Sequence, residues 1–384
     1  MSSYTPIDDP SAYFQVFTYT GNGSHPRNLT NDGNSDLKPD FIWVKNLSDN
    51  GTNHVLANST MGFDAPNAPS AGGQLATDSS AGINTPAATY GYVSAALTDG
   101  FTAAAGGTNG DTCNANAKEF VAWQWKANGG TTTSVSASGT GNGCVNACTH
   151  QANTTAGFSI ITYTGRDDQL NNGQHSLLKH GLGAKPDLTI LKRLDAAGDW
   201  YVSGKNIGTT PYSNNEFMSL NDADAVNGNY YTGSIAPTTT DIYLGNAYTN
   251  IASASYVMYA FAAKQGYSRF HFYRGNGQAD GPNIFTGFKP AFVIIKREGG
   301  TGSWSLYDHK RATTHNPIET WMRSNGTEGE STSTISGDDI DLLSNGFKIR
   351  SNDNTLNSSG QDYSFWAWAE NPFVTSGGTP TTAR

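Results

Sequence analysis

The sequence has few charged residues, few cysteines and no long apolar run. Because no stretch of about 18 or more apolar residues occurs, we expect no transmembrane helix. Only 14% of the 384 residues are charged, the net charge is −9, and Lys and Arg form no cluster, which argues against binding to nucleic-acid phosphates. The first residues include neither a basic nor an apolar region, so we expect a soluble protein without a Sec signal.

Signals for helices are also missing. The sequence has no convincing amphipathic period and no heptad run, so we expect no coiled-coil trimerisation segment. Its 44 glycines, with abundant Ser, Thr and Asn, are typical of the turns of all-β proteins. An aromatic content of 11% supplies apolar surface for packed cores and argues against disorder. We therefore predict an all-β protein.

One short phrase occurs three times, at residues 37–46, 184–193 and 288–297. Each copy has a Lys-Pro pair, a run of β-branched and aromatic residues, and a basic residue at its end. Proline is tolerated at the first position of a strand, and the apolar run that follows is too short for a helix. Each copy therefore predicts one buried strand, which we call the anchor strand.

Two further landmarks keep the same order around each anchor strand. Upstream lies an alternating run that ends in Tyr-X-Gly, at residues 19–21, 163–165 and 273–275. Downstream lies an aromatic run, at residues 120–125, 256–261 and 363–368. Landmarks in constant order, separated by loops of unequal length, indicate homologous domains and not a solenoid. We predict three tandem antiparallel β-sandwich domains.

The landmarks divide the chain into six predicted parts. These are an N-terminal arm (1–10), a first repeat (11–126), a flexible linker rich in Gly, Ser and Thr (127–156), a second repeat (157–264), a third repeat (265–373) and a polar tail (374–384). The last two repeats have hardly any linker between them, so we expect them to pack in a fixed relation and the first to be set apart. Residues 65–88 predict a long loop over the first sandwich or against a partner.

The three cysteines leave two readings open. A disulfide between Cys144 and Cys148 is possible and leaves Cys113 over. A zinc site from the first two and His150 is less favoured, because it lacks the second ligand pair of structural zinc sites. The acidic residues 338–341 could bind calcium, but they lie beside a turn and have no counterpart in the other repeats, so we interpret them as a solvated loop. We expect no metal and no cofactor.

Catalytic signatures are absent. The sequence has no Gly-X-Ser-X-Gly motif, and its eight histidines are scattered, which argues against acyl transfer. A glycosidase needs two carboxylates that face one sugar, and no such pair is evident. We therefore expect a protein that binds and does not catalyse.

Aromatic rings beside Asn, Asp and Gln suit sugar binding, because a ring covers the apolar face of a hexose while amides and carboxylates pair with its hydroxyls. Trp321 is the first choice, because its polar surroundings make it the hardest to explain as a core residue. The other candidates are Trp304 and Tyr307 in the third repeat and Trp200, Tyr212, Tyr230 and Tyr231 in the second. We interpret the remaining tryptophans of the predicted strands as core or inter-domain packing: Trp43, Trp123, Trp125, Trp366 and Trp368.

The ordered motifs resemble a known repeat domain. In the third repeat the resemblance lies in residues 273–277, 286–290, 343–348 and 367–373, and in the first repeat in residues 19–24, 38–46 and 121–123. The chain resembles an uncharacterised repeat domain of fibre-like and other virion structural proteins of tailed bacteriophages, often from marine and cyanobacterial hosts. The resemblance implies a concanavalin-like, lectin-like jelly-roll sandwich and no catalytic residues. The lack of a coiled coil or triple-stranded shaft departs from long, free-standing fibres.

This resemblance leads to three functional hypotheses. The first is a tail-fibre-like or receptor-binding component of a virion that contacts host surface carbohydrate. The second is a decoration or cement protein of the capsid or tail, whose contacts are residues 1–10 and 65–88. The third is a polysaccharide depolymerase. In the first two, we expect other virion proteins as partners and a homo-oligomer, with no nucleic acid and no membrane insertion.

Overall fold

The computed structural model describes residues 4–63, 73–83, 90–106, 112–169, 171, 173–208, 216–228, 235–245, 247–311, 316–332 and 339–381. The predicted all-β character is confirmed, because these residues form several antiparallel sheets. Helical segments in the described ranges are short: η1 (Pro10–Ala12), η2 (Asp167–Gln169) and α2 (Ala247–Asn250). Among the described helices, none has the length and apolarity to cross a membrane.

Three larger sheets share one strand order, in which an opening strand pairs with the closing strand, and the closing strand with the anchor strand. The first contains β1 (Phe14–Thr20), β7 (Glu119–Trp125), β3 (Phe41–Asn46) and β4 (Val55–Asn58). The second contains β8 (Thr133–Val135), β9 (Cys148–Asn153), β10 (Phe158–Thr164), β16 (Ser255–Phe261), β12 (Leu188–Arg193), β13 (Trp200–Gly204) and β14 (Met218–Ser219). The third contains β17 (Ser268–Arg274), β25 (Asp362–Pro372), β19 (Phe288–Arg297), β20 (Ser305–Asp308), β21 (Thr320–Arg323) and β22 (Ser331–Thr332).

Each larger sheet shares an apolar cluster with a smaller antiparallel sheet of the same repeat. The smaller sheets are β2 (Arg27–Leu29), β6 (Phe101–Ala104) and β5 (Tyr92–Ala96); β11 (Ser176–Lys179) and β15 (Asp241–Leu244); and β18 (Asn283–Phe285), β24 (Gly346–Ile349) and β23 (Ile340–Leu343). One face of every larger sheet is therefore buried within its own repeat.

The anchor strands occupy the same place in the three sheets. Equivalent residues of the anchor strands lie opposite equivalent residues of the closing strands: Phe41 opposite Trp125, Leu188 opposite Phe261, and Phe292 opposite Trp368. The prediction of a strand after each Lys-Pro pair is therefore confirmed. The third copy differs in detail, because β19 begins before Pro290 and continues through it across a register shift, a place where strands tolerate proline.

The Tyr-X-Gly phrase has the same role in each repeat. The tyrosine ring stacks on an aromatic ring of the closing strand, in the pairs Tyr19–Phe120, Tyr163–Tyr256 and Tyr273–Tyr363, with centroids 5.1, 4.9 and 5.1 Å apart. The glycine is required by a close approach of backbone, because a Cβ at Gly21, Gly165 or Gly275 would lie 1.9, 2.0 or 2.3 Å from a carbonyl oxygen.

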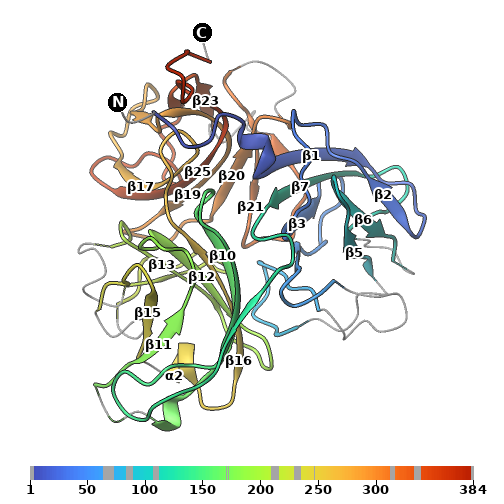
Figure 1. Cartoon of the computed structure of the whole chain (residues 1–384). Coiled ribbons are helices and arrows are strands. Elements are labelled where there is room, and N and C mark those ends of the chain that lie inside the picture. The colour runs from blue at the N-terminus through green and yellow to red at the C-terminus, as the bar shows by residue number, and fades with distance from the viewer. Residues whose placement is uncertain are drawn as a thin grey trace.

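The other faces of the three larger sheets meet in one apolar cluster, which we call the central core. Phe292 of the third repeat stacks on Trp123 of the first with centroids 4.8 Å apart, and Phe41 of the first lies 4.4 Å from Tyr259 of the second. Figure 1 shows the blue-teal, green-yellow and orange-red parts of the chain arranged around one middle. The expectation that the first repeat is set apart is therefore wrong. The packing interpretation of Trp43, Trp123, Trp125, Trp366 and Trp368 is confirmed.

The segment 127–156 is part of a sheet and not the flexible linker that its composition predicts. Its strands β8 and β9 add to the free side of β10, with Ser134 opposite Thr149 and Thr149 opposite Thr162. The prediction failed because a segment rich in Gly, Ser and Thr can form strands when a neighbouring edge supplies hydrogen-bond partners.

The N-terminal arm packs on the third repeat of its own chain. Ile7 is buried in the central core, and the hydroxyl of Tyr4 donates to the Gly287 carbonyl at 2.9 Å. Asp8 accepts a hydrogen bond from the Ser376 amide at 2.6 Å, so the arm also meets the C-terminal tail. Figure 1 shows both chain ends on the same side of the body. The described part of the loop 65–88 lies between the first two repeats, where Leu75 is buried in the central core.

We predict that the repeats unfold together, because they share the central core. Phe292→Ala should lower the free energy of unfolding by about 3–5 kcal/mol, the usual cost of removing a buried aromatic ring. Calorimetry should show one cooperative transition before and after the change. The matched control is Phe285→Ala, whose ring is 54% exposed, and its effect should stay within about 0.5 kcal/mol. A separate unfolding transition of the third repeat, at a lower temperature than that of the other two repeats, would contradict the shared core.

Candidate functional site

Four of the five aromatic residues expected to bind glycan lie in the interior. The exposed fractions are 7% for Trp321, 1% for Trp304, and 0% for Tyr307 and Trp200. Tyr230 lies outside the described residues, as do Tyr212 and Tyr231. The four described rings stand on or beside strands that follow the anchor strands: Trp200 and Trp304 belong to the central core, and Tyr307 and Trp321 belong to the core of the third repeat. This burial disagrees with the expectation of exposed rings, because the four rings pack in the interior.

Two of these tryptophans join one repeat to the preceding one. The indole Nε1 of Trp200 donates to the Ala76 carbonyl of the first repeat at 2.8 Å. The indole Nε1 of Trp304 donates to the Ser219 carbonyl of the second repeat at 2.9 Å. Because the indole N–H is the only polar atom of the ring, this bond lets the whole side chain be buried.

At the third junction, between the first and third repeats, a histidine takes this place. The Nε2 atom of His54 lies 2.9 Å from the Arg323 carbonyl of the third repeat, and its Nδ1 atom accepts from the Trp43 indole at 2.9 Å. Burial holds the pKa of His54 well below its usual value, so the ring is neutral and can accept at Nδ1 while it donates at Nε2. The three junctions therefore form a cycle: second to first, third to second, and first to third.

Each anchor strand also carries a buried lysine whose ammonium group donates to a loop of the preceding repeat in this cycle. Lys45 donates to the Thr327 carbonyl at 3.1 Å, Lys192 to Ser80 at 2.7 Å, and Lys296 to Ala223 and Asp224 at 3.3 and 2.7 Å. Burial lowers the pKa of each lysine to about 8. Backbone amides reach the same loops: Gly51 donates to Thr327 at 2.9 Å, Gly198 to Ser80 at 2.8 Å, and Gly302 to Ala223 at 2.8 Å.

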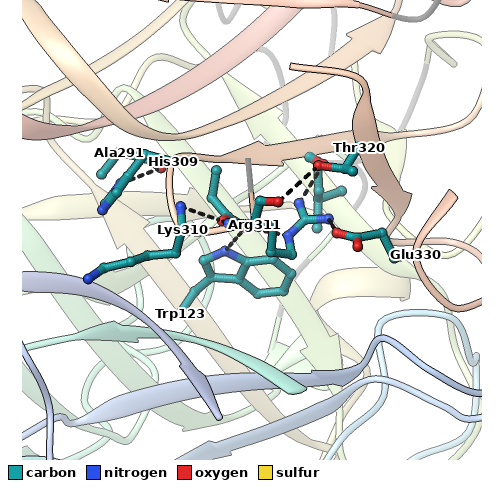
Figure 2. Close-up of polar contacts among 9 residues, drawn as sticks. Trp123, Ala291, His309, Lys310, Arg311, Thr320 and Glu330 are labelled. Carbon is teal, nitrogen blue, oxygen red and sulfur yellow. Dashed lines mark hydrogen bonds and ion pairs between the residues drawn. The ribbon is translucent and has the colours of Figure 1, made fainter. Parts of the chain in front are cut away.

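The junction between the third and first repeats contains an additional buried ion pair (Figure 2). Arg311 donates through Nε to Asp308 at 2.6 Å and through Nη1 to Glu330 at 3.1 Å. The indole Nε1 of Trp123, in the first repeat, donates to the same Asp308 carboxylate at 3.1 Å. Removing one partner of such a network would leave a buried charge without its partner. The hydrogen bond from Trp123 to Asp308 ties this network to the first repeat and so helps to fix how the first and third repeats meet.

An open groove of about 690 Å³ lies where the second sheet extends past the central core. Phe158 and Ile160 of β10 face that core, and the two-residue period of a strand places Thr162 and Thr164 further along the same face. Thr149 of β9 lies beside Thr162, and Ser134 of β8 lies beside Thr149. The floor is therefore a row of hydroxyl groups, two members of which come from the segment 127–156.

Aliphatic side chains form the sides of the groove. Met61 and Ile83 come from the first repeat, and Leu194 follows the anchor strand of the second. Gln151, on the same face of β9, donates to the Thr60 hydroxyl at 2.6 Å, and the Ile83 amide donates to the Leu194 carbonyl at 2.9 Å. These bonds hold the sides against the floor.

The three cysteines are buried and form no disulfide with one another. The structure corrects the possible disulfide between Cys144 and Cys148, because these two residues of the segment 127–156 stay unbonded. The Cys148 side chain packs in the core of the second repeat, on the face of β9 opposite the groove, and burial raises the pKa of its thiol, so the thiol is protonated at neutral pH and is a poor nucleophile.

The described residues contain no group of three or more His, Cys, Asp or Glu side chains that could hold a metal ion. Within the acidic segment 338–341, Asp338 lies outside the described residues. The Asp341 carboxylate pairs with Arg350 at 2.7 Å, so it serves in an ion pair of the smaller sheet.

The hydroxyl floor was not among the sites predicted from the sequence. Its signal is weak but present, because threonine and serine occupy alternate positions of the short segments 133–136 and 160–164. Alternation shows that two residues share a face of a strand. It cannot show that β8, β9 and β10 lie side by side, which the groove requires.

Comparison with known proteins places the chain in a family. A profile described as "Domain of unknown function (DUF7483)" matches residues 9–372. The chain belongs to this family. No curated protein and no solved structure matches the sequence. The family match spans all three repeats and the junctions between them, so the cyclic unit and not one repeat corresponds to the DUF7483 domain.

We predict a pH-dependent stability that comes from Glu298 at the junction of the second and third repeats. Its carboxyl group accepts from the Gly208 amide at 3.1 Å and from the Ser364 hydroxyl, and burial raises its pKa from 4.5 to about 7. Between these pH values the unfolded chain releases a proton that the folded chain keeps, so stability falls as pH rises through this window. The loss should reach as much as about 3 kcal/mol.

Glu298→Gln should remove this dependence, because the amide can make both contacts without a charge. Urea unfolding between pH 4.5 and 7.5 measures the effect, with the exposed Glu319→Gln as the control. Profiles that are parallel for wild type and Glu298→Gln would rule out a protonated Glu298.

Proposed function

We propose that this protein is a compact, tail-fibre-like or receptor-binding component of a bacteriophage virion that contacts glycan on the host surface. The observation that carries the proposal is the cycle of junctions, in which Trp200, Trp304 and His54 each bond to a neighbouring repeat. Such a cycle supports a rigid, self-contained body, as an adhesive head needs, and offers no shaft. The virion setting rests on the sequence resemblance.

The proposal includes a finer description of the fold. Each larger sheet and its smaller partner form one lectin-like, jelly-roll β-sandwich, and the three sandwiches follow one another along the chain. The shared strand order and the separate apolar cluster within each repeat support this description. We also propose that the protein assembles into a homo-oligomer and contacts other virion proteins.

A purely structural role as a capsid or tail decoration protein is the second candidate. It is favoured by the burial of Trp321, Trp304, Tyr307 and Trp200, because these rings stabilise the body and are not offered to a ligand. The two candidates differ in copy number, since decoration proteins are abundant on a particle and receptor-binding components are few.

Mass spectrometry of purified virions tests the proposal. We expect the protein in the particle at low copy number relative to the major capsid protein, with antibody label at the tail. The purified full chain, added before infection, should compete with the phage for host cells and slow adsorption. Many copies spread over the capsid would favour decoration. Absence from purified virions would refute both candidates.

A further inference from the structure

We infer that the groove on the second sheet is a binding site for a short, neutral oligosaccharide. This inference rests on the proposed adhesive function and assigns its ligand site. The groove, of about 690 Å³, falls within the range of about 300–1,000 Å³ that is usual for ligand sites. It combines the floor of hydroxyl groups with aliphatic sides and is open to solvent along the floor, where Ser134, Thr164 and Ser255 are exposed.

The lining matches the chemistry of a sugar. Seven of the 16 lining residues are Ser or Thr, and a hydroxyl group both donates and accepts, as sugar hydroxyls do. Met61, Ile83 and Leu194 supply apolar contacts for the C–H faces of a pyranose ring. Both halves of a carbohydrate surface, polar edge and apolar face, therefore have a counterpart.

The charges of the groove disfavour an anionic ligand. No Lys or Arg belongs to the lining in the described ranges, and its one carboxylate is Asp195. Arg193 pairs with Asp195 at 2.8 Å, and this hydrogen bond lowers the pKa of the carboxyl group, so it stays ionised as an acceptor for ligand hydroxyls. With a net charge of −9, the chain would also repel an acidic polysaccharide.

The described residues of the other two repeats do not form this floor at the equivalent place. In the described residues, β1 and β17 are the outermost strands of their sheets, whereas β10 is extended by β9 and β8. The residue equivalent to Thr162 is Thr18 in the first repeat and Phe272 in the third. Each lies opposite the same position of its closing strand: Thr18 opposite Val121, Thr162 opposite Val257, and Phe272 opposite Ser364. The segment 127–156 therefore gives the second repeat a floor that the shared architecture does not require.

A glycan array with neutral and anionic arms tests the inference on the full chain. The neutral arm carries short oligomers of glucose, galactose, mannose and N-acetylglucosamine, and the anionic arm carries sialylated and uronic-acid oligomers. We expect binding on the neutral arm alone, with the affinity then measured by titration calorimetry. Binding to the anionic arm instead, or to neither arm, would overturn the inference.

Variants of the floor localise the binding. Thr162→Val keeps the side-chain shape and removes one hydroxyl group, and it should weaken binding about tenfold. The matched control is Thr18→Val, which makes the same change at the equivalent position outside the groove and should leave affinity unchanged. If Thr162→Val lowers the melting temperature more than the control does, Ser255→Trp serves as a second variant that blocks the groove from an exposed position.

Equal affinity in Thr162→Val, Ser255→Trp and the control would place the sugar elsewhere and overturn the site. That outcome would not contradict the proposed virion role, because this role is tested by the presence of the protein in the particle. Absence from virions, with binding in the groove intact, would refute the proposed role and not the site.

Discussion

The structure depends on the burial of aromatic and aliphatic residues between the three larger sheets. One repeat on its own would bury one face of its larger sheet and leave the other to water. Here the second faces meet in the central core, where Phe292, Trp123 and Tyr259 come from three different repeats. Cyclic contacts then fix the arrangement, because each junction satisfies the polar groups that burial would otherwise leave without partners.

The local structure could be predicted from the sequence, but the arrangement could not. The Lys-Pro and Tyr-X-Gly phrases predict strands because proline, glycine and tyrosine act through the local backbone and the neighbouring strand. Trp304 misled the prediction, since its neighbours Ser303 and Ser305 suggest a surface loop. Its burial depends on a carbonyl group 85 residues away, at Ser219. The segment 127–156 was predicted as a linker for a similar reason: its strands form against the edge of β10, which the composition of the segment does not show.

The cyclic architecture separates stability from recognition. Residues that repeat three times, such as Lys45, Lys192 and Lys296, hold the body together and are buried. The features that occur once, above all β8 and β9, lie outside this framework and build the groove. A framework held by repeated contacts tolerates such an addition, because β9 pairs with the edge of β10 and neither β8 nor β9 contributes a residue to the central core. The proposed site thus lies on the part of the DUF7483 domain that breaks its internal symmetry.

Hydrogen exchange at the junctions tests most directly whether the three repeats form one closed body. The amides of Gly51, Gly198 and Gly302 each donate across a different junction, and they lie outside the sheets. If the cycle is closed in solution, all three amides should exchange only through global unfolding, as slowly as the amides of the anchor strands. Fast exchange at Gly51, with Gly198 and Gly302 protected, would mean that the first and third repeats do not meet, and it would contradict the cyclic fold.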